Sequence, residues 1–363
     1  MSAGAIVMML VVFAGFFGYQ IFGRAKLAAW QAERSPPPGR KRDEEAFAML
    51  DGPHRAALVA LERDDVAPAV AALAALRDGA WNERASLLRY FRETITRGPL
   101  DAAIATSPSE PILHLLRAVQ SMEWAWEARG GGGASGVSAE GWRKFEERMG
   151  LAEQDLNRAA QLDPADPTPH ALLVEVARHV KHGEARARAH LDAAIARNPA
   201  DVAARNNFFT FFCLRRYEGS FEKMQSFARE HVAGAPNGDL RHAFVFRMHH
   251  EMWSYEHAFG DPATGDAYAA RPDVRAEVAE SYARSVGAPE HRRSFASLAR
   301  INDFAAWFFL VQDRERCRDA LSKLGDDQYA KHPWTELGPP SKQFDVARAW
   351  ATKGGPHQVL GWR

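Results

Sequence analysis

The chain has 363 residues, of which 46% are hydrophobic, so it can bury a substantial core. Its 46 lysines and arginines balance its 46 aspartates and glutamates, and this net charge of zero argues against a nucleic-acid partner or an acidic substrate drawn in by a global field. The two cysteines, Cys213 and Cys317, match neither a zinc-binding pair nor a disulfide framework, so we expect free, buried thiols.

The first predicted element is a transmembrane helix over residues 5–23. This segment carries no charge and, at ~1.5 Å per residue, it approaches the ~30 Å thickness of the hydrocarbon core of a bilayer. A cleaved signal peptide is the alternative, but residues 2–4 carry no basic side chain and no small-x-small cleavage site follows. The sequence therefore predicts a retained, single-pass anchor in the cell membrane.

A basic, proline-rich linker is expected over residues 24–42. Three consecutive prolines, at positions 36–38, break any helix there. The basic residues on this side of the anchor place it in the cytoplasm by the positive-inside rule, so we expect the large domain to be cytoplasmic, with an extracytoplasmic domain as the alternative. The basic cluster either binds anionic headgroups or acts only as a topology signal.

From residue 43 onward the apolar residues recur at helical spacing, and the fold class expected is all-α. Asn82 is a candidate N-cap for one of these helices. A loop over Asp261–Asp266 suggests a boundary, so we expect a repeat domain over residues 43–260 and a C-terminal helical extension or cap over residues 261–363.

Two segments of the expected repeat domain are nearly the same. Leu156–Pro164 and Leu191–Pro199 are spaced 35 residues apart and share the pattern Leu-x-x-Ala-x-x-x-x-Pro. A period of this length indicates stacked helical hairpins, because a single hairpin cannot bury its apolar face alone. Small residues let two helices approach closely, and the proline prevents the second helix from continuing.

This pattern resembles the tetratricopeptide family. The positions that match the family are Ala152, Leu156, Ala159, Leu162 and Pro164 in the first unit, and Ala187, Leu191, Ala194 and Pro199 in the second. Arg197 departs from the pattern, since it stands where a large apolar residue is usual. The resemblance is clearest over residues 111–236, and it implies an α-solenoid of helical hairpins that follows the transmembrane helix.

A narrower resemblance is carried by Arg215–Arg229, Met248–Trp253 and Trp124–Gly130. These strings are similar to an uncharacterised group of bacterial, membrane-anchored, tetratricopeptide-like proteins, which implies a fold and no catalytic activity. Gly219 permits a tight turn between helices and Ser220 can cap the helix that follows.

One group of histidines could in principle bind a metal ion. His242, His249, His250 and His257 lie on one expected helical segment, but the His-Glu-x-x-His spacing that places two metal ligands one turn apart is absent. We therefore expect these side chains to serve in interhelical packing or at a polar rim, with no cofactor. No nucleophile and base stand at recognisable spacing, so no catalytic residue is expected.

The function expected from these features is that of a membrane-anchored scaffold for protein–protein interaction. Such a scaffold would bind a protein or peptide on its concave face, which we place at Leu173–Arg178 and Asn206–Arg215. The alternative function is a metal-binding protein or enzyme centred on the helix that carries His249, His250 and His257.

Overall fold

The computed structural model describes residues 44–77, 79–131, 136–179, 183–214, 219–326 and 328–361. In these ranges every regular element is a helix, which confirms the all-α class. The expected transmembrane helix at residues 5–23 and the linker at 24–42 lie outside the described residues. Among the helices of the described ranges, none combines the length and the apolar character needed to cross a bilayer.

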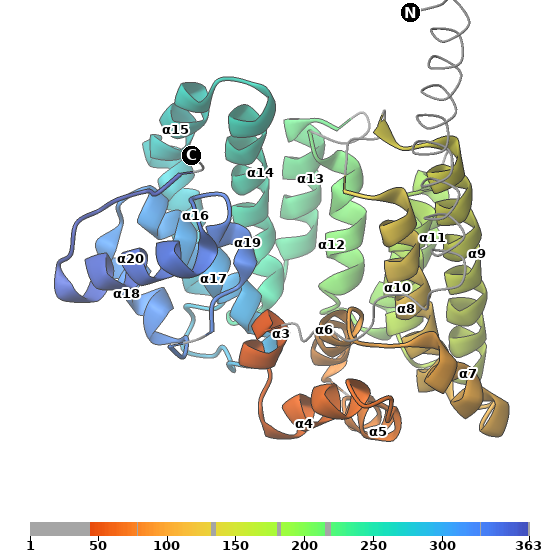
Figure 1. The fold of residues 1–363 in the computed structure, drawn as a ribbon. Coiled ribbons are helices and arrows are strands. Elements are labelled where there is room, and N and C mark those ends of the chain that lie inside the picture. Colours follow the sequence, from red (N-terminus) through yellow and green to blue (C-terminus); the bar gives the residue numbers. More distant parts are fainter. Residues whose placement is uncertain are drawn as a thin grey trace, which may run out of the picture.

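The N-terminal helices form the lower layer of the molecule in Figure 1. They are α3 (Glu44–Met49), α4 (Gly52–Leu61), α5 (Ala67–Ala74), α6 (Trp81–Phe91) and α7 (Arg97–Thr106). Asn82 is not the N-cap of α6, so that expectation was wrong, because the helix already begins at Trp81 after Ala80. The Asn82 side chain bonds instead to a distant segment of the backbone.

The next helices stand side by side in a row (Figure 1). They are α8 (Pro111–Arg129), α9 (Ala139–Leu162), α10 (Thr168–Ala177), α11 (Glu184–Arg197), α12 (Ala203–Phe209), η3 (Thr210–Phe212), α13 (Phe221–Val232), η4 (Leu240–His242) and α14 (Ala243–Phe259). Helix α8 packs on α9 and α10 packs on α11, while α10 also contacts α9 and α12. Side-chain caps begin α9 and α13, among others: Ser138 accepts from the amide of Gly141, and Ser220 accepts from the amide of Lys223.

The C-terminal helices gather at the other end of the row (Figure 1). They are α15 (Pro262–Ala270), α16 (Pro272–Arg284), α17 (Phe295–Leu310), α18 (Arg314–Ser322), α19 (Lys331–Trp334) and α20 (Pro340–Lys353). Helix α17 is buried along most of its length and contacts α14, α18, α19 and α20, as well as α6. It is therefore the central helix of this end of the molecule.

The positions that match the repeat pattern occupy equivalent places in α9 and α11. The alanines and leucines at the helix contacts are completely buried: Ala152, Leu156, Ala159, Ala187, Leu191 and Ala194. Each helix ends two residues before its proline, at Leu162 before Pro164 and at Arg197 before Pro199. Arg197, which departs from the repeat pattern, links the two units, because its Nε donates a hydrogen bond to the carbonyl of Pro164 at 2.7 Å.

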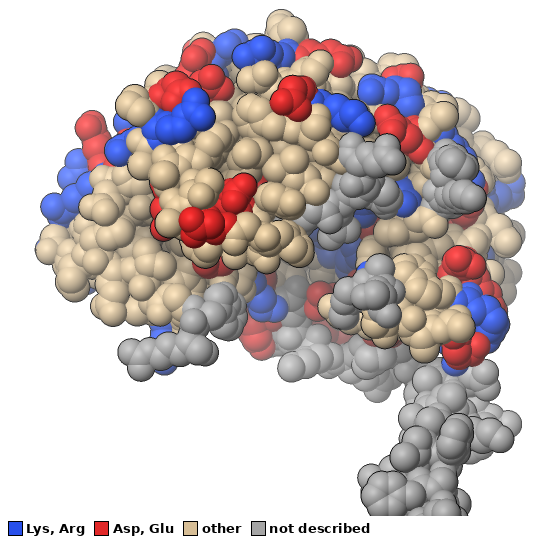
Figure 2. Space-filling model, turned by 90° about the horizontal axis from the view of Figure 1, so that it is seen from above, with Lys and Arg blue, Asp and Glu red and all other residues tan. Residues whose placement is uncertain are grey.

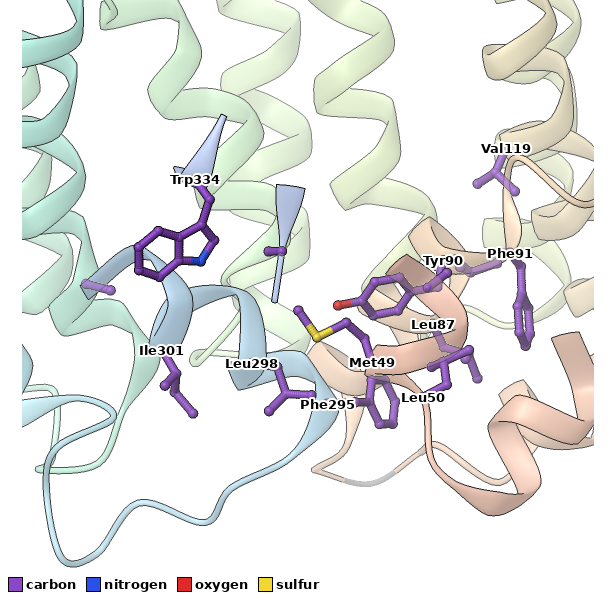
Figure 3. Close-up of a cluster of buried hydrophobic side chains, with 14 of the residues drawn as sticks. Met49, Leu50, Leu87, Tyr90, Phe91, Val119, Phe295, Leu298, Ile301 and Trp334 are labelled. Atoms are coloured by element: carbon purple, nitrogen blue, oxygen red, sulfur yellow. The ribbon is translucent and has the colours of Figure 1, made fainter. Parts of the chain in front are cut away.

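Residues far apart in the sequence form one hydrophobic cluster (Figure 3). Met49 of α3 and Tyr90 of α6 lie close to Phe295 and Leu298 of α17 in this view. All four side chains are at most 8% exposed. Helix α6 also contacts α8, α10 and α12, so it lies on the inner side of the row and connects its two ends.

The surface carries both signs of charge. Figure 2 shows basic and acidic side chains interspersed among uncharged residues on the face seen from above. This distribution agrees with the balanced composition and gives that face no field of a single sign.

Candidate functional site

A cavity of about 500 Å³ opens on the inner side of the row of helices. Helices α6, α8, α10, α12, α14 and α17 supply most of its walls, and His332 of α19 reaches it as well. The segments expected to form the concave face contribute Glu175 of α10 and Arg178 directly after it, together with Asn206 of α12 and Thr210 of η3. Arg215, at the end of the second expected segment, lies outside the described residues.

Helix α6 closes one side of this cavity and is bound to the end of the second repeat unit. The Asn82 amide donates a hydrogen bond to the carbonyl of Ala200 at 2.9 Å, and its oxygen accepts one from the amide of Val202 at 2.9 Å. A single asparagine therefore satisfies two backbone groups in the loop that follows Pro199.

The end of the first repeat unit holds the same helix through charge. Arg84 of α6 donates to Asp166 at 2.6 Å, and both side chains are at most 2% exposed. Arg77, just before α6, forms a second ion pair with Asp163 at 2.8 Å. The two loops that end the repeat units thus fix the position of α6, and with it the shape of the cavity.

The described lining of the cavity has an excess of positive charge. Its arginines outnumber its carboxylates by five to three: Arg89, Arg92, Arg178, Arg247 and Arg300 against Glu175, Glu251 and Asp303. Arg92 pairs with Glu123 at 2.8 Å, and Arg300 pairs with Asp303 at 2.9 Å. The neutral composition of the whole chain conceals this local excess.

Arg247 carries the most unusual charge of the cavity. Its guanidinium donates to uncharged acceptors, the carbonyl of Asn206 at 3.0 Å and the hydroxyl of Thr210 at 3.4 Å. Burial lowers the pKa of Arg247 to about 10; the positive charges of Arg300 and Arg178 act in the same direction, and Cys213 and the nearby carboxylate of Glu251 oppose it. The group is still charged at neutral pH, so the cavity contains a desolvated cation to which an anion would bring a net gain.

The histidines singled out in the sequence are held by different partners. His242 lies against the carbonyl of Pro236 at 3.1 Å, and His249 contacts the hydroxyl of Tyr268 at 2.7 Å. His257 contacts Asp266 at 2.9 Å. Of the four, only His250 lines the cavity.

His250 belongs to a cluster that the sequence analysis missed. Its Nε2 lies 2.6 Å from Oε2 of Glu336, whose other oxygen lies 3.3 Å from Nε2 of His332. The hydroxyl of Ser254 donates to the same carboxylate at 3.0 Å. The only sequence signal for this cluster is the four-residue spacing of His332 and Glu336, which does not point to His250 on a helix 86 residues from Glu336.

The remaining predicted site residues lie at turns. A Cβ on Gly219 would come within 2.2 Å of the carbonyl oxygen of Cys213, so the backbone approaches too closely there for any side chain. Ser220 is the N-cap of α13. Cys213 and Cys317 are both buried, and neither forms a disulfide.

Comparisons with known proteins find no match to the chain among family models, curated proteins or solved structures.

Proposed function

We propose that this protein is a membrane-anchored binding scaffold, built as an α-solenoid of tetratricopeptide-like hairpins, whose cavity receives an acidic segment of a partner protein. The equivalent burial of Ala152, Leu156 and Ala159 in α9 and of their counterparts in α11 supports the repeat. The side-by-side packing of α8 to α12 supports the solenoid.

The observation that most supports an acidic partner is the environment of Arg247. A carboxylate that reaches it would replace neutral acceptors by a charge-assisted, bidentate contact, which is about twice as strong as a neutral hydrogen bond. Arg89 lines the same cavity from α6 and is exposed, so it can meet a second carboxylate. The volume of about 500 Å³ is within the range of ligand pockets and accommodates a few side chains.

The test uses the full-length protein in mild detergent and a fluorescent hexaglutamate peptide, with hexaglutamine as the neutral probe. We expect the anisotropy of the acidic peptide to report binding that weakens as salt is raised, because part of the attraction is electrostatic. Arg247→Gln and Arg89→Gln should each weaken it by about tenfold, the equivalent of losing one charged contact. Arg275→Gln is the matched control, since Arg275 is exposed on α16 and does not line the cavity.

Equal affinity for the two peptides would contradict the proposal, as would an effect of Arg275→Gln as large as that of Arg247→Gln. If glutarate alone competes fully at the same concentration of carboxylate groups, the site takes a small anion and the peptide proposal fails.

The anchor at residues 5–23 and the cytoplasmic placement of the large domain are part of the same proposal. They are supported by the uncharged apolar run and by the basic residues that follow it. Full-length protein should stay with membranes after alkaline carbonate washing, and a tag fused after residue 363 should be digested by protease only when the cytoplasmic side is accessible. Release by carbonate would refute the anchor.

A further inference from the structure

We propose that His250, His332 and Glu336 bind a divalent transition-metal ion of the zinc type at the wall of the cavity. This inference goes beyond the scaffold function and does not depend on it. The site also differs from the alternative predicted from the sequence, which used histidines of one helix, because it combines His250 of that helix with His332 and Glu336 from the segment around α19.

The geometry of the three donors fits one ion. One ligand atom from each side chain lies within 4.8 Å of the others. In a tetrahedral site with Zn–N and Zn–O bonds of ~2.0–2.1 Å, neighbouring ligand atoms lie ~3.3 Å apart. Glu336 and His332 already have this separation, at 3.3 Å, whereas the 2.6 Å contact of Glu336 with His250 is a hydrogen bond that would lengthen by ~0.7 Å. A small rotation about the side-chain torsions provides that change.

The chemistry of the donors also fits. Two imidazoles and one carboxylate form the ligand set of many catalytic zinc and non-haem iron sites. An ion bound here would replace the contacts that His250 and His332 now make with the Glu336 carboxyl, at 2.6 Å and 3.3 Å, by bonds from all three side chains to the metal, with release of protons.

The segment that supplies two of the donors is hydrogen-bonded to α17. Asn302 of α17 accepts hydrogen bonds from the amide of Ala330 at 3.1 Å and from the indole of Trp334 at 2.8 Å. Trp334 is completely buried, and Pro333 favours the extended backbone that His332 adopts. Preorganised ligands lose little conformational entropy on binding, which favours a specific site over a chance grouping of side chains.

The site has an open side. His250 and His332 both line the cavity, and the His332 side chain is 63% exposed there. Three protein ligands with a fourth position open to a cavity are typical of sites that bind or activate a ligand, since structural zinc sites have four protein ligands. Arg300, a nearby positive charge that would oppose an ion, is itself paired with Asp303 at 2.9 Å.

The test is a titration of the EDTA-treated, full-length protein in detergent with Zn²⁺ alone, followed by calorimetry and by metal analysis after desalting. We expect one equivalent of zinc, and with Co²⁺ an absorption band of tetrahedral type. Glu336→Gln and His332→Ala should each weaken binding at least ~100-fold, because both remove a direct ligand. His257→Ala is the matched control, since His257 lies on the same helix as His250 but contacts Asp266 instead.

His332 is largely exposed, so its replacement leaves the packing intact, and circular dichroism with thermal unfolding verifies this for each variant. Failure of the wild-type protein to retain an equivalent of zinc would overturn the proposal. Zinc that is retained equally by His332→Ala and Glu336→Gln would also overturn it, because the ion would then lie elsewhere. Hexaglutamate binding measured in EDTA tests the scaffold function separately, so the two proposals can fail independently.

Discussion

Replacing Arg84 by methionine should destabilise the protein more than any change of a surface charge. Methionine keeps much of the volume and the apolar stem, but it removes the 2.6 Å contact with Asp166 and the 3.0 Å hydrogen bond from Nε to the carbonyl of Leu73. Asp166 is 2% exposed, so its charge would stay buried without this partner. Breaking a buried ion pair from one side costs ~3–5 kcal/mol, and we expect a loss of this size in the free energy of unfolding.

The double variant Arg84→Met with Asp166→Asn distinguishes the cost of leaving the Asp166 charge unpaired from the cost of losing the hydrogen bonds of Arg84. Asparagine removes the buried negative charge but keeps an oxygen that can accept from the amide of Thr168, as Asp166 does at 2.8 Å. Because no unpaired charge is left, the double variant should lose no more than ~2 kcal/mol, less than Arg84→Met alone. The two substitutions are therefore expected to be strongly non-additive.

The assay is urea unfolding of the full-length protein in mild detergent, followed by tryptophan fluorescence. The ten tryptophans are spread over the chain, so their fluorescence follows global unfolding; one of them, Trp81, begins α6 and lies beside the Arg84 guanidinium. Arg143→Met is the control, because Arg143 forms its ion pairs with Glu140 and Glu147 on the exposed side of α9 and should leave stability unchanged. A loss below ~1 kcal/mol for Arg84→Met, or a double variant that loses the sum of the two single variants, would refute this reasoning.

Three further predictions concern pH and the backbone. Partial loss of solvent at the cavity wall opposes the charge of the largely exposed His332 and that of the more buried Glu336, but the contact between them raises the pKa of His332 and lowers that of Glu336. The contribution of this ion pair to the free energy of unfolding is then fully present between about pH 4.5 and 6.5. It is lost as the pH falls through the lowered pKa of Glu336 or rises through the raised pKa of His332. In EDTA, the wild-type protein should lose stability above about pH 6.5, and the His332→Gln variant should not show this loss. Burial raises the pKa of Asp201 to about 6, so the contribution of this residue to the free energy of unfolding falls as the pH rises from ~4 to ~6. The Asp201→Asn variant should therefore be more stable than the wild type by ~1–3 kcal/mol at pH 7 in urea unfolding. A less stable variant would show that burial of the charge is not the dominant effect. Gly219→Ala should lower the melting temperature by several degrees, because its Cβ meets the backbone of Cys213, whereas an unchanged melting temperature would show that the turn relaxes freely.

The helical class and the ends of α9 and α11 could be predicted because their signals are local. Apolar spacing and a proline act within a few residues, so Leu156 and Pro164 define one helix end without reference to the rest of the chain. Arg197 was recognised as a departure, but its bond to the carbonyl of Pro164 depends on how two units stack. Asn82 was misread for the same reason, since its partners lie about 120 residues away.

The candidate site could be predicted only in part. The two segments predicted from the repeat pattern as a concave face supply residues of α10 and α12 that line the cavity. The excess of arginine there could not be read from a chain with no net charge, because it depends on which of many charged side chains point inward. The metal-ligand cluster could not be predicted either, since a contact between His250 and Glu336 is set by tertiary packing and not by spacing.

Helix α6 gives the cavity a wall that belongs to neither of the two recognised repeat units. Asn82 and Arg84 fasten this helix to the loops after Pro199 and Pro164, while Arg89 on the same helix faces the cavity. Under the proposed function, a substitution at an exposed position of α6 such as Arg89 would therefore alter what the cavity binds and leave the contacts between α9 and α10 and between α10 and α11 in place. The residues that would set selectivity are then distinct from those that pack the helices together, so the two sets could change independently in evolution or in design.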